Sequence, residues 1–277
     1  MKNYLDLLKE IKDTAVEMND RTGTGTISVI CKSIEHDLRN GFPLLTTKKI
    51  HFKSVAHELL WFLSGSDNIS YLKENNVRIW NEWATEDGSL GPVYGVQWRK
   101  WRDENGNELD QIANVIDLIK NKPNSRRILF HGWNVAYLPD ESVSPQENVI
   151  NGKMALPPCH LLYQFFVRNG ELHAVMYQRS ADMFLGIPFN IASLSLLTSM
   201  LANFCDLTPA TVKIFIGDAH IYKNHFEQVD LQLSRETKEL PKLLIKRKPE
   251  SFFDYTIDDF EIIGYDPHPA IKGEISV

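Results

Sequence analysis

A chain of 277 residues, 43% of them hydrophobic and 24% charged, is long enough to bury a sizeable core. Its formal net charge of -6 argues against a general nucleic-acid binder, and so against DNA as a partner, because such proteins gain affinity mainly from many Lys and Arg side chains. No apolar run approaches the roughly 20 residues that span a bilayer, and no signal-peptide pattern is present, so we expect a cytoplasmic protein without a membrane partner.

The cysteines and histidines do not form a metal-binding pattern. The three cysteines are odd in number and widely spaced, which argues against a disulfide framework, and no Cys-x-x-Cys pair indicates a zinc knuckle. His57-Glu58 begins like a zinc-protease helix, but Trp61 stands where the second His is needed. We therefore predict no metal site.

Apolar residues at helical spacing predict three helices in the first half of the chain, over residues 4–18, 52–64 and 109–121. Short strands are predicted after the first and third of these helices, at 27–30 and 128–130. The segment 139–152 is polar and without periodicity, which predicts an exposed loop inserted into the domain.

A β-hairpin is predicted next, because Asn169-Gly170 suits the positive backbone angles of a tight turn between strands 161–167 and 172–177. An apolar helix over 191–204, a β-branched strand over 212–216 and a proline-punctuated tail follow. Helices that alternate with runs of strands, without a regular βαβ rhythm, predict one α+β domain over residues 1–277, built on a mixed twisted sheet flanked by helices.

Cys159 is a candidate nucleophile, although free cysteine is also a common small core residue. Two prolines precede it, and Arg179 and Ser180 lie at the far end of the predicted hairpin. A thiol near an arginine has its pKa lowered, and the thiolate is the reactive form. Neighbours in a strand point to opposite faces, so we do not expect His160 to be the base for Cys159, as a protease would require.

Other polar and aromatic residues have both a chemical and a structural interpretation. Glu58 lies in an apolar stretch, where burial would raise its carboxyl pKa toward a value suited to proton transfer, unless the side chain reaches solvent. Four arginines at element boundaries either converge on an anion or stay solvated: Arg21, Arg126, Arg127 and Arg179. Tyr94 and nearby tryptophans form either a core wall or a platform for a planar ligand: Trp80, Trp83, Trp98 and Trp101.

Ordered motifs along nearly the whole chain resemble the thymidylate synthase family. They are the segments 19–25, 57–63, 90–95, 158–160, 178–180, 184–193, 218–222, 232–236 and 265–269, which include Pro158-Cys159-His160 and Gln178-Arg179-Ser180. So many matches in the family's order leave little room for coincidence.

The resemblance implies a role for each matching residue. The catalytic residues would be Cys159, Glu58, Tyr94, Arg179, Asn190 and Asp182. Deoxyuridine monophosphate (dUMP) would be bound by Arg21, Arg126, Arg127, Gln178, Arg179, Ser180, Asp182, Asn190, His220 and Tyr222. The folate would be bound by His51, Trp80, Trp83, Asp182, Leu185, Gly186, Phe189, Ser276 and Val277.

The implied reaction is the reductive methylation of dUMP to dTMP. The cosubstrate 5,10-methylenetetrahydrofolate would be both carbon donor and reductant, so neither flavin nor metal is expected. Cys159 would add to C6 of the pyrimidine, and Glu58 with Tyr94 would manage proton transfers. The resemblance also implies a homodimer with sheets packed back to back, Arg126 and Arg127 donated to the partner's site, and a C-terminal lid over 273–277.

The nearest alternative is a deoxycytidylate hydroxymethylase, which resembles this family in fold and adds water instead of hydride. We expect aspartate at position 190 in a cytosine-directed enzyme, whereas Asn190 presents both a donor and an acceptor to uracil. A second, regulatory activity, in which the protein binds its own messenger RNA, stays open.

Overall fold

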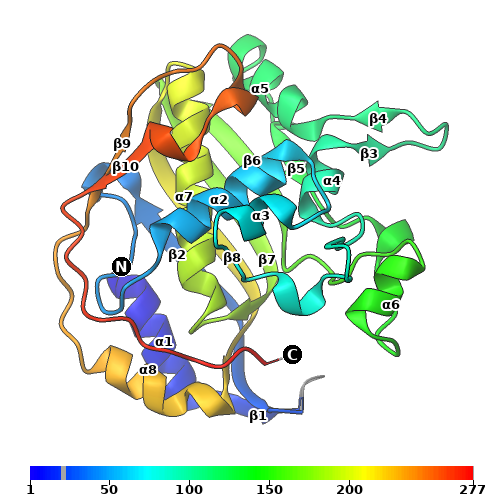
Figure 1. Cartoon of the computed structure of the whole chain (residues 1–277). Helices are drawn as coiled ribbons and strands as arrows, with labels where there is room; N and C mark the ends of the chain where they lie inside the picture. The colour runs from blue at the N-terminus through cyan, green and yellow to red at the C-terminus, as the bar shows by residue number, and fades with distance from the viewer. Residues whose placement is uncertain (20–22, 277) are drawn as a thin grey trace.

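Six strands form one mixed sheet in the order β1-β2-β8-β7-β6-β5 in the computed structural model, which describes residues 1–19 and 23–276 (Figure 1). The strands are β1 (Val16–Met18), β2 (Thr26–Asp37), β5 (Leu129–His131), β6 (His160–Arg168), β7 (Glu171–Asp182) and β8 (Thr208–Tyr222). Neighbouring strands pair antiparallel, except that β7 and β8 are parallel. An α+β domain on a mixed sheet, as predicted, is confirmed.

Helices cover one face of this sheet and its margins (Figure 1). They are α1 (Lys2–Thr14), α2 (Phe52–Ser64), α3 (Ser70–Glu74), α4 (Tyr94–Arg99), α5 (Gln111–Asn121), α6 (Pro145–Ile150), α7 (Gly186–Phe204) and α8 (Phe226–Leu233). The crossover helix α7 packs on β7 and β8, and α2 packs on α7. The core therefore lies between the sheet and these two helices.

Helix α7 is more apolar than expected. It has 19 residues and, by length and composition alone, could cross a membrane, although no apolar run near that length is apparent in the sequence. Because 78% of this stretch is buried inside the protein, α7 has the character of a core helix.

The hairpin of β6 and β7 turns at Asn169 and Gly170, as predicted. Both residues have positive φ, 51° and 77°, the region that Asn and Gly tolerate best. Pairs such as Phe165 opposite Ala174 then run along the two strands to the end where Cys159 lies. The turn thus fixes which residues of β7 lie beside Cys159.

The outer face of the sheet exposes large apolar side chains. Tyr177 in β7 and Phe215 in β8 pair with each other and are 42% and 43% exposed, while Met176 and Ile216 beside them are buried. Ile30 in β2 is 68% exposed. Large apolar groups are therefore gathered on this face, and such a patch is uncommon on the surface of a soluble protein.

Several predicted boundaries are wrong. The first helix ends at Thr14, because Ala15 is already extended, and Val16–Met18 form the edge strand β1. The predicted strands 27–30 and 212–216 belong to strands of 12 and 15 residues, β2 and β8. The third helix starts after Asp110, whose side chain caps it by accepting from the Ala113 N–H at 2.9 Å.

The segment 139–152 is not an irregular loop, because it contains the short helix α6. Ser144 caps this helix by accepting a hydrogen bond from the Glu147 N–H at 3.1 Å, and Pro145 takes its first position. The buried Asn148 amide bonds both backbone groups of Asp140, at 2.7 and 2.9 Å. This segment is therefore ordered by polar contacts. Such contacts produce no apolar periodicity in the sequence, so the helix was not predicted.

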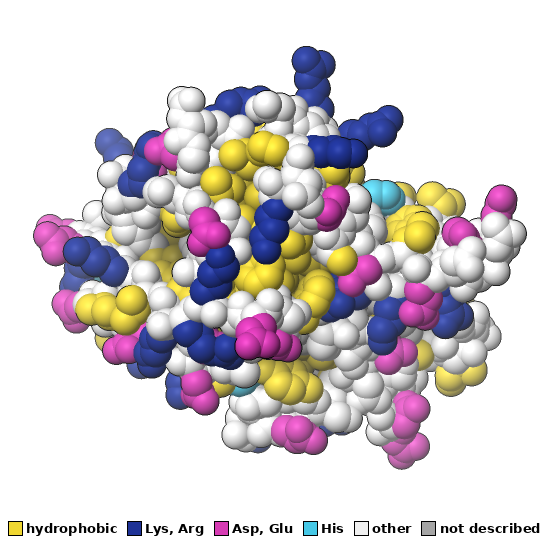
Figure 2. Space-filling view, turned by 90° about the horizontal axis from the view of Figure 1, so that it is seen from above, with side chains coloured by type: hydrophobic (Ala, Val, Ile, Leu, Met, Phe, Trp, Pro, Cys, Tyr) yellow, Lys and Arg dark blue, Asp and Glu magenta, His cyan; other side chains and the backbone are white. Residues whose placement is uncertain are grey.

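Two small ribbons lie outside the main sheet. They are β3 (Trp101–Arg102) with β4 (Glu108–Leu109), and β9 (Lys242–Ile245) with β10 (Phe260–Ile263). The end of the molecule that carries β9, β10 and α5 in Figure 1 is seen from above in Figure 2, where apolar side chains fill the middle and basic and acidic side chains alternate around them. Charges of both signs are interspersed there, as on an ordinary solvated surface.

Candidate active site

Cys159 lies between Pro158 and the start of β6 and is partly exposed. Its N–H donates to the Tyr94 hydroxyl oxygen at 2.9 Å, and its carbonyl oxygen accepts from the Arg179 N–H at 2.9 Å. Tyr94 is in α4 and Arg179 in β7, so two elements far apart in sequence hold this backbone. The thiol is thereby presented on a fixed turn.

Arg179 surrounds the same turn from the other side. Its Nε donates to the Pro158 carbonyl at 2.8 Å, and its Nη2 donates to the Pro157 carbonyl at 3.1 Å and lies 3.9 Å from Cys159 Sγ. Burial raises the pKa of the Cys159 thiol above its ordinary value, and Arg179 only partly offsets this. The expectation that Arg179 leaves the thiol with a lowered pKa is therefore wrong, because desolvation outweighs the nearby charge.

Glu58 is buried within α2, as its apolar neighbours indicated, and only 8% of it is exposed. Trp80 donates its indole N–H to Glu58 Oε1 at 2.8 Å. Burial raises the pKa of this carboxyl to about 7, although the hydrogen bond from Trp80 acts in the opposite direction. The carboxyl group can therefore accept and return a proton near neutral pH.

Aromatic rings connect Glu58 to Cys159. Trp80 contacts Tyr94, with ring centres 5.9 Å apart, and Tyr94 stacks on His160 at 4.5 Å. Trp83 meets Trp80 edge to face at 5.7 Å and is partly exposed. The predicted aromatic region is therefore both a core wall and, at Trp83, an accessible surface.

Asn190 and Gln178 form an amide pair on the core side of β7. Gln178 Nε2 donates to Asn190 Oδ1 at 3.0 Å and to the Ser180 carbonyl at 3.1 Å. This contact orients Asn190 with its NH₂ group away from Gln178. Within residues 1–19 and 23–276, the buried Oε1 of Gln178 has no hydrogen-bond partner, and a buried acceptor without a partner is costly.

Asp182 ends β7 and organises the turn into α7. Its Oδ1 accepts from the Phe184 and Leu185 N–H groups at 2.8 and 3.1 Å. Gly186 follows, and a methyl group there would meet only Asp182 and Asn190, at ordinary contact distance. Leu185, Gly186 and Phe189 stay partly exposed beside this turn.

His220 and Tyr222 lie at the end of β8, next to the end of β7. Asp182 pairs with His220, and Ser180 pairs with Asp218, across the parallel strands. His220 Nδ1 lies 2.8 Å from Asp218 Oδ1, and the Tyr222 ring meets the His220 ring edge to face at 5.2 Å. The structure thus brings these predicted dUMP residues to the same end of the paired strands β7 and β8 as Arg179.

The C-terminal segment packs near the turn before β2. Thr24 donates to the Ser276 hydroxyl oxygen at 3.2 Å, and the Glu274 carbonyl lies 2.8 Å from His225 Nε2. Figure 1 places this end of the chain near β1. Arg21 and Val277 lie outside the described residues, so their predicted roles are not tested.

Arg126 and Arg127 do not join this cluster. They are exposed before β5, the edge strand, and their side chains make no hydrogen bond or ion pair within the described part of the chain. His51, predicted to contact folate, is exposed at the start of α2, with Nδ1 2.8 Å from the Ser54 hydroxyl. The family resemblance assigned Arg126 and Arg127 to the partner's site and His51 to the folate, and these roles stay predictions.

Two buried residues near the site escaped sequence reasoning. Lys48 donates its ammonium group to the Phe184 carbonyl and lies 3.5 Å from the centre of the Phe184 ring, and burial lowers its pKa to about 7 although Asp182 opposes this. Tyr163 bonds His160, with 2.6 Å between its hydroxyl and Nδ1. Tyr163 and Phe165 flank the polar Gln164, an alternation that indicates two core-facing side chains in a strand. Nothing in the sequence indicated that Lys48 is buried.

No group of three or more His, Cys, Asp or Glu side chains suited to a metal ion occurs among residues 1–19 and 23–276. The fold and the contacts above define a single-domain α+β protein with a cysteine at the centre of its polar cluster.

Comparison with known proteins agrees with this class. A family model described as thymidylate synthase matches residues 2–277. The thymidylate synthase of Pseudomonas fluorescens (strain SBW25) is 57% identical over 277 residues, which is 100% of both chains. Those of Francisella philomiragia and Francisella tularensis subsp. holarctica are 58% and 59% identical, again over 100% of both chains. The chain belongs to the thymidylate synthase family, and it is a methyltransferase of dTMP biosynthesis.

Proposed function

We propose that the protein converts dUMP to dTMP at Cys159, with 5,10-methylenetetrahydrofolate as cosubstrate. The observation that carries this assignment is the partly exposed Cys159 thiol 3.9 Å from Arg179 Nη2, with its backbone bonded to Tyr94. Tyr94 in turn contacts Trp80, which holds Glu58. A nucleophile and a titratable carboxyl group thus share one connected site.

Cys159 acts as the nucleophile. Its sulfur, as the thiolate, adds to C6 of the pyrimidine ring and forms a C–S bond, and the displaced electron pair makes C5 nucleophilic. Since burial raises the pKa of this thiol, Arg179 favours the anion that must form. The bonds from Tyr94 and Arg179 to the backbone keep the sulfur in position for attack.

Glu58 moves the protons. With a pKa of about 7, it is present in both forms near neutral pH, so it can protonate a ring oxygen through ordered water and later help to remove the C5 proton. A carboxyl group of ordinary pKa would be almost entirely ionised there and a poor acid. The burial of α2 thus produces the proton donor.

The folate group fits beside Asp182. Leu185 and Phe189 are apolar side chains left partly exposed there, as a planar ring requires, and Gly186 leaves room next to them. Trp83 is partly exposed beside Trp80. When bound, 5,10-methylenetetrahydrofolate supplies the one-carbon unit and the hydride. The residues proposed to hold it are His51, Trp80, Trp83, Asp182, Leu185, Gly186, Phe189, Ser276 and Val277.

The nucleotide would be bound at its uracil ring, at its sugar and at its phosphate. Asn190, oriented by Gln178, would bond the uracil edge, and the unpartnered Gln178 Oε1 marks a position where a donor is needed. His220 and Tyr222 would hold the sugar hydroxyl. Arg21, Arg179 and Ser180, with Arg126 and Arg127 of the partner subunit, would bind the phosphate, because arginine forks match phosphate oxygens.

A homodimer would complete this phosphate site. The exposed Tyr177 and Phe215 on the outer face of the sheet form the apolar surface for the back-to-back contact. The side chains of Arg126 and Arg127 are exposed and make no hydrogen bond or ion pair within the described chain, so they could enter a partner's site from the sheet edge.

The assignment is tested by mixing purified protein with dUMP and 5,10-methylenetetrahydrofolate and following dihydrofolate by absorbance. We expect steady formation by the unaltered protein and a loss of at least about 10³-fold in kcat for Cys159→Ala. Cys205→Ala is the matched control, since that thiol lies at the end of α7 away from the site. Activity retained by Cys159→Ala would overturn the mechanism.

The donated arginines are tested by subunit complementation. Cys159→Ala and Arg126→Ala are each expected to be weakly active alone. After unfolding and refolding together, random pairing should restore about one quarter of the unaltered activity, because half of the dimers are mixed and one of their two sites is intact. If mixing restores nothing while both variants refold as dimers, Arg126 serves its own chain.

A further inference from the structure

His160 and Tyr163 meet because β6 is irregular. Residues three apart in a regular strand face opposite sides of the sheet. The register of β6 against β7 shifts between His160 and Leu162, so that one extra residue is accommodated there. Bulges of this kind re-aim side chains next to active sites, and here both side chains point to the core, where they are 9% and 5% exposed.

The contact between them has only one satisfactory arrangement of hydrogens. The Tyr163 hydroxyl lies 2.6 Å from His160 Nδ1 and makes no other hydrogen bond within residues 1–19 and 23–276. If it accepted a proton from Nδ1, its own O–H would be buried without an acceptor, which costs free energy. The phenol therefore donates, and Nδ1 accepts.

Both groups are uncharged at neutral pH, which this arrangement requires. Burial lowers the pKa of His160 to about 3, and burial raises the pKa of Tyr163 well above its ordinary value. A neutral imidazole carries one proton, so with Nδ1 as acceptor that proton is on Nε2. Apart from a contact between the ring and the His160 backbone itself, Tyr163 is the hydrogen-bond partner that the described residues supply to this ring.

We propose that Tyr163 is a positioning residue that fixes His160 as its Nε2–H tautomer, so that the ring next to Cys159 presents one permanent hydrogen-bond donor to the bound nucleotide. The ring is held in place as well, because it stacks on Tyr94 at 4.5 Å with 25° between the planes. When sulfur adds to C6, negative charge grows on a pyrimidine oxygen, and an N–H donor already in place stabilises that charge without reorganisation. This role rests on the proposed function.

The tautomer is read directly by nitrogen NMR on ligand-free protein with labelled histidines. The chain has nine histidines, and His160→Gln identifies the signal of interest. We expect a protonated Nε2 and an unprotonated Nδ1 in the unaltered protein, and a mixture of both tautomers in Tyr163→Phe. A protonated Nδ1 in the unaltered protein, or an unchanged tautomer in the variant, would overturn the inference.

Kinetics supply the second measurement. For Tyr163→Phe we expect kcat to fall about 5-fold, the equivalent of one buried hydrogen bond, with KM for dUMP changed less than about 2-fold. Tyr255→Phe is the matched control, because Tyr255 is also a buried phenol, bonded to Asn203 and far from Cys159 in the fold. It should lose stability to a similar extent but leave the His160 signals and kcat unchanged.

Failure of this inference and failure of the proposed function are distinguishable. If dihydrofolate forms but Tyr163→Phe alters neither the tautomer nor kcat, Tyr163 is only a satisfied core residue. If the tautomer responds as expected but no dihydrofolate forms, the positioning holds and the proposed reaction is wrong.

Discussion

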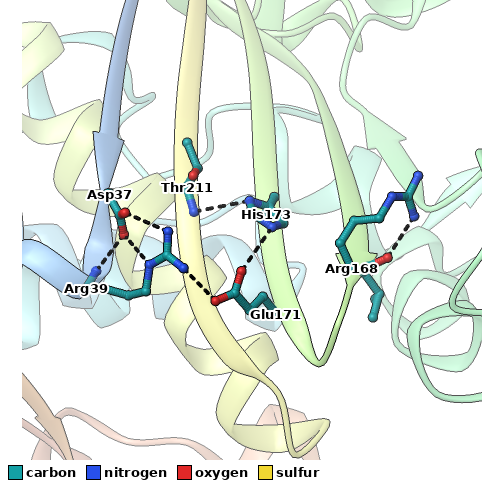
Figure 3. Close-up of polar contacts among 7 residues, drawn as sticks. Asp37, Arg39, Arg168, Glu171, His173 and Thr211 are labelled. Carbon is teal, nitrogen blue, oxygen red and sulfur yellow. Dashed lines mark hydrogen bonds and ion pairs between the residues drawn. The ribbon is translucent and has the colours of Figure 1, made fainter.

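Strand β7 carries a polar cluster at each of its ends, and the two clusters behave in opposite ways. At its C-terminal end, Arg179 and Asp182 lie beside Cys159 within the core-facing site. At its N-terminal end, Glu171 accepts from Arg39, which also pairs with Asp37 at the end of β2 (Figure 3). Figure 3 shows this second cluster spanning β2, β8 and β7.

The two clusters differ in their exposure to solvent, although both contain several hydrogen bonds. Near Cys159, burial shifts groups toward their neutral forms, with the pKa of Glu58 at about 7 and that of His160 at about 3. At the other end, hydrogen bonds from Arg39 lower the pKa of Asp37 to about 2, which keeps it charged. Neutral groups that titrate near pH 7 can exchange protons, whereas permanently charged pairs can only hold strands together.

Among changes to titrating and charged groups of the two clusters, the largest effect is expected for Glu58→Gln, which keeps the shape of the buried side chain and the acceptor for Trp80. Without a titrating carboxyl group, kcat should fall about 10²- to 10³-fold, while dUMP still binds. Dihydrofolate formation and dUMP binding by calorimetry measure the two quantities. An active variant would show that the proton donor lies elsewhere. Burial of the cluster near Cys159 would then not explain its function.

The same variant also tests how the stability of the folded protein depends on pH. Because the folded pKa of Glu58 is raised from 4.5 to about 7, its contribution to stability is full below the unfolded value and is lost as pH rises through 7. Relative to the unaltered protein, the free energy of unfolding of Glu58→Gln should therefore rise by about 3 kcal/mol between low and neutral pH. Urea unfolding at several pH values measures it, and a constant difference would mean that Glu58 is solvated.

An intermediate effect is expected for Arg179→Ala. Arg179 offsets part of the rise in the pKa of Cys159, so its removal should move the pH dependence of thiol alkylation to still higher pH. Arg179→Lys keeps the charge and should move it less, although it loses the fork that holds Pro157 and Pro158. Alkylation with an unchanged pH profile in Arg179→Ala would mean that the guanidinium only supports the turn.

Local signals explain which parts of the fold were predictable. The second helix ends at Gly65, which has the left-handed φ of 70° that ends helices, and the hairpin turns at Asn169-Gly170. Strands β2 and β8 were underestimated because polar residues such as Glu35 and Lys213 occupy their outer face and interrupt the apolar runs. The end of the first helix was misplaced because residues 15–18 pair with β2, a contact distant in sequence from the helix signal.

The chemistry of the site was predictable only where one effect dominates. The apolar neighbours of Glu58 are enough to indicate burial and a raised pKa. For Cys159 two opposing effects compete, and only the three-dimensional packing decides that desolvation exceeds the influence of Arg179. The pairing of His160 with Tyr163 depends on a bulge, which periodicity in the sequence does not show.

The smallest effect is expected for Arg39→Ala, at the other end of β7. Its pairs with Asp37 and Glu171 are short, 2.7 and 2.5 Å, but the side chain is nearly half exposed, so solvent screens most of their energy. The thermal midpoint should fall by no more than about 2 °C, with kcat unchanged. Arg168→Ala is the control, because that arginine of the same region bonds only the Val167 carbonyl in the described chain. A loss of stability for Arg39→Ala as large as that from a buried group would mean that this end of the sheet is dry in solution, as it would be if a partner subunit covered it.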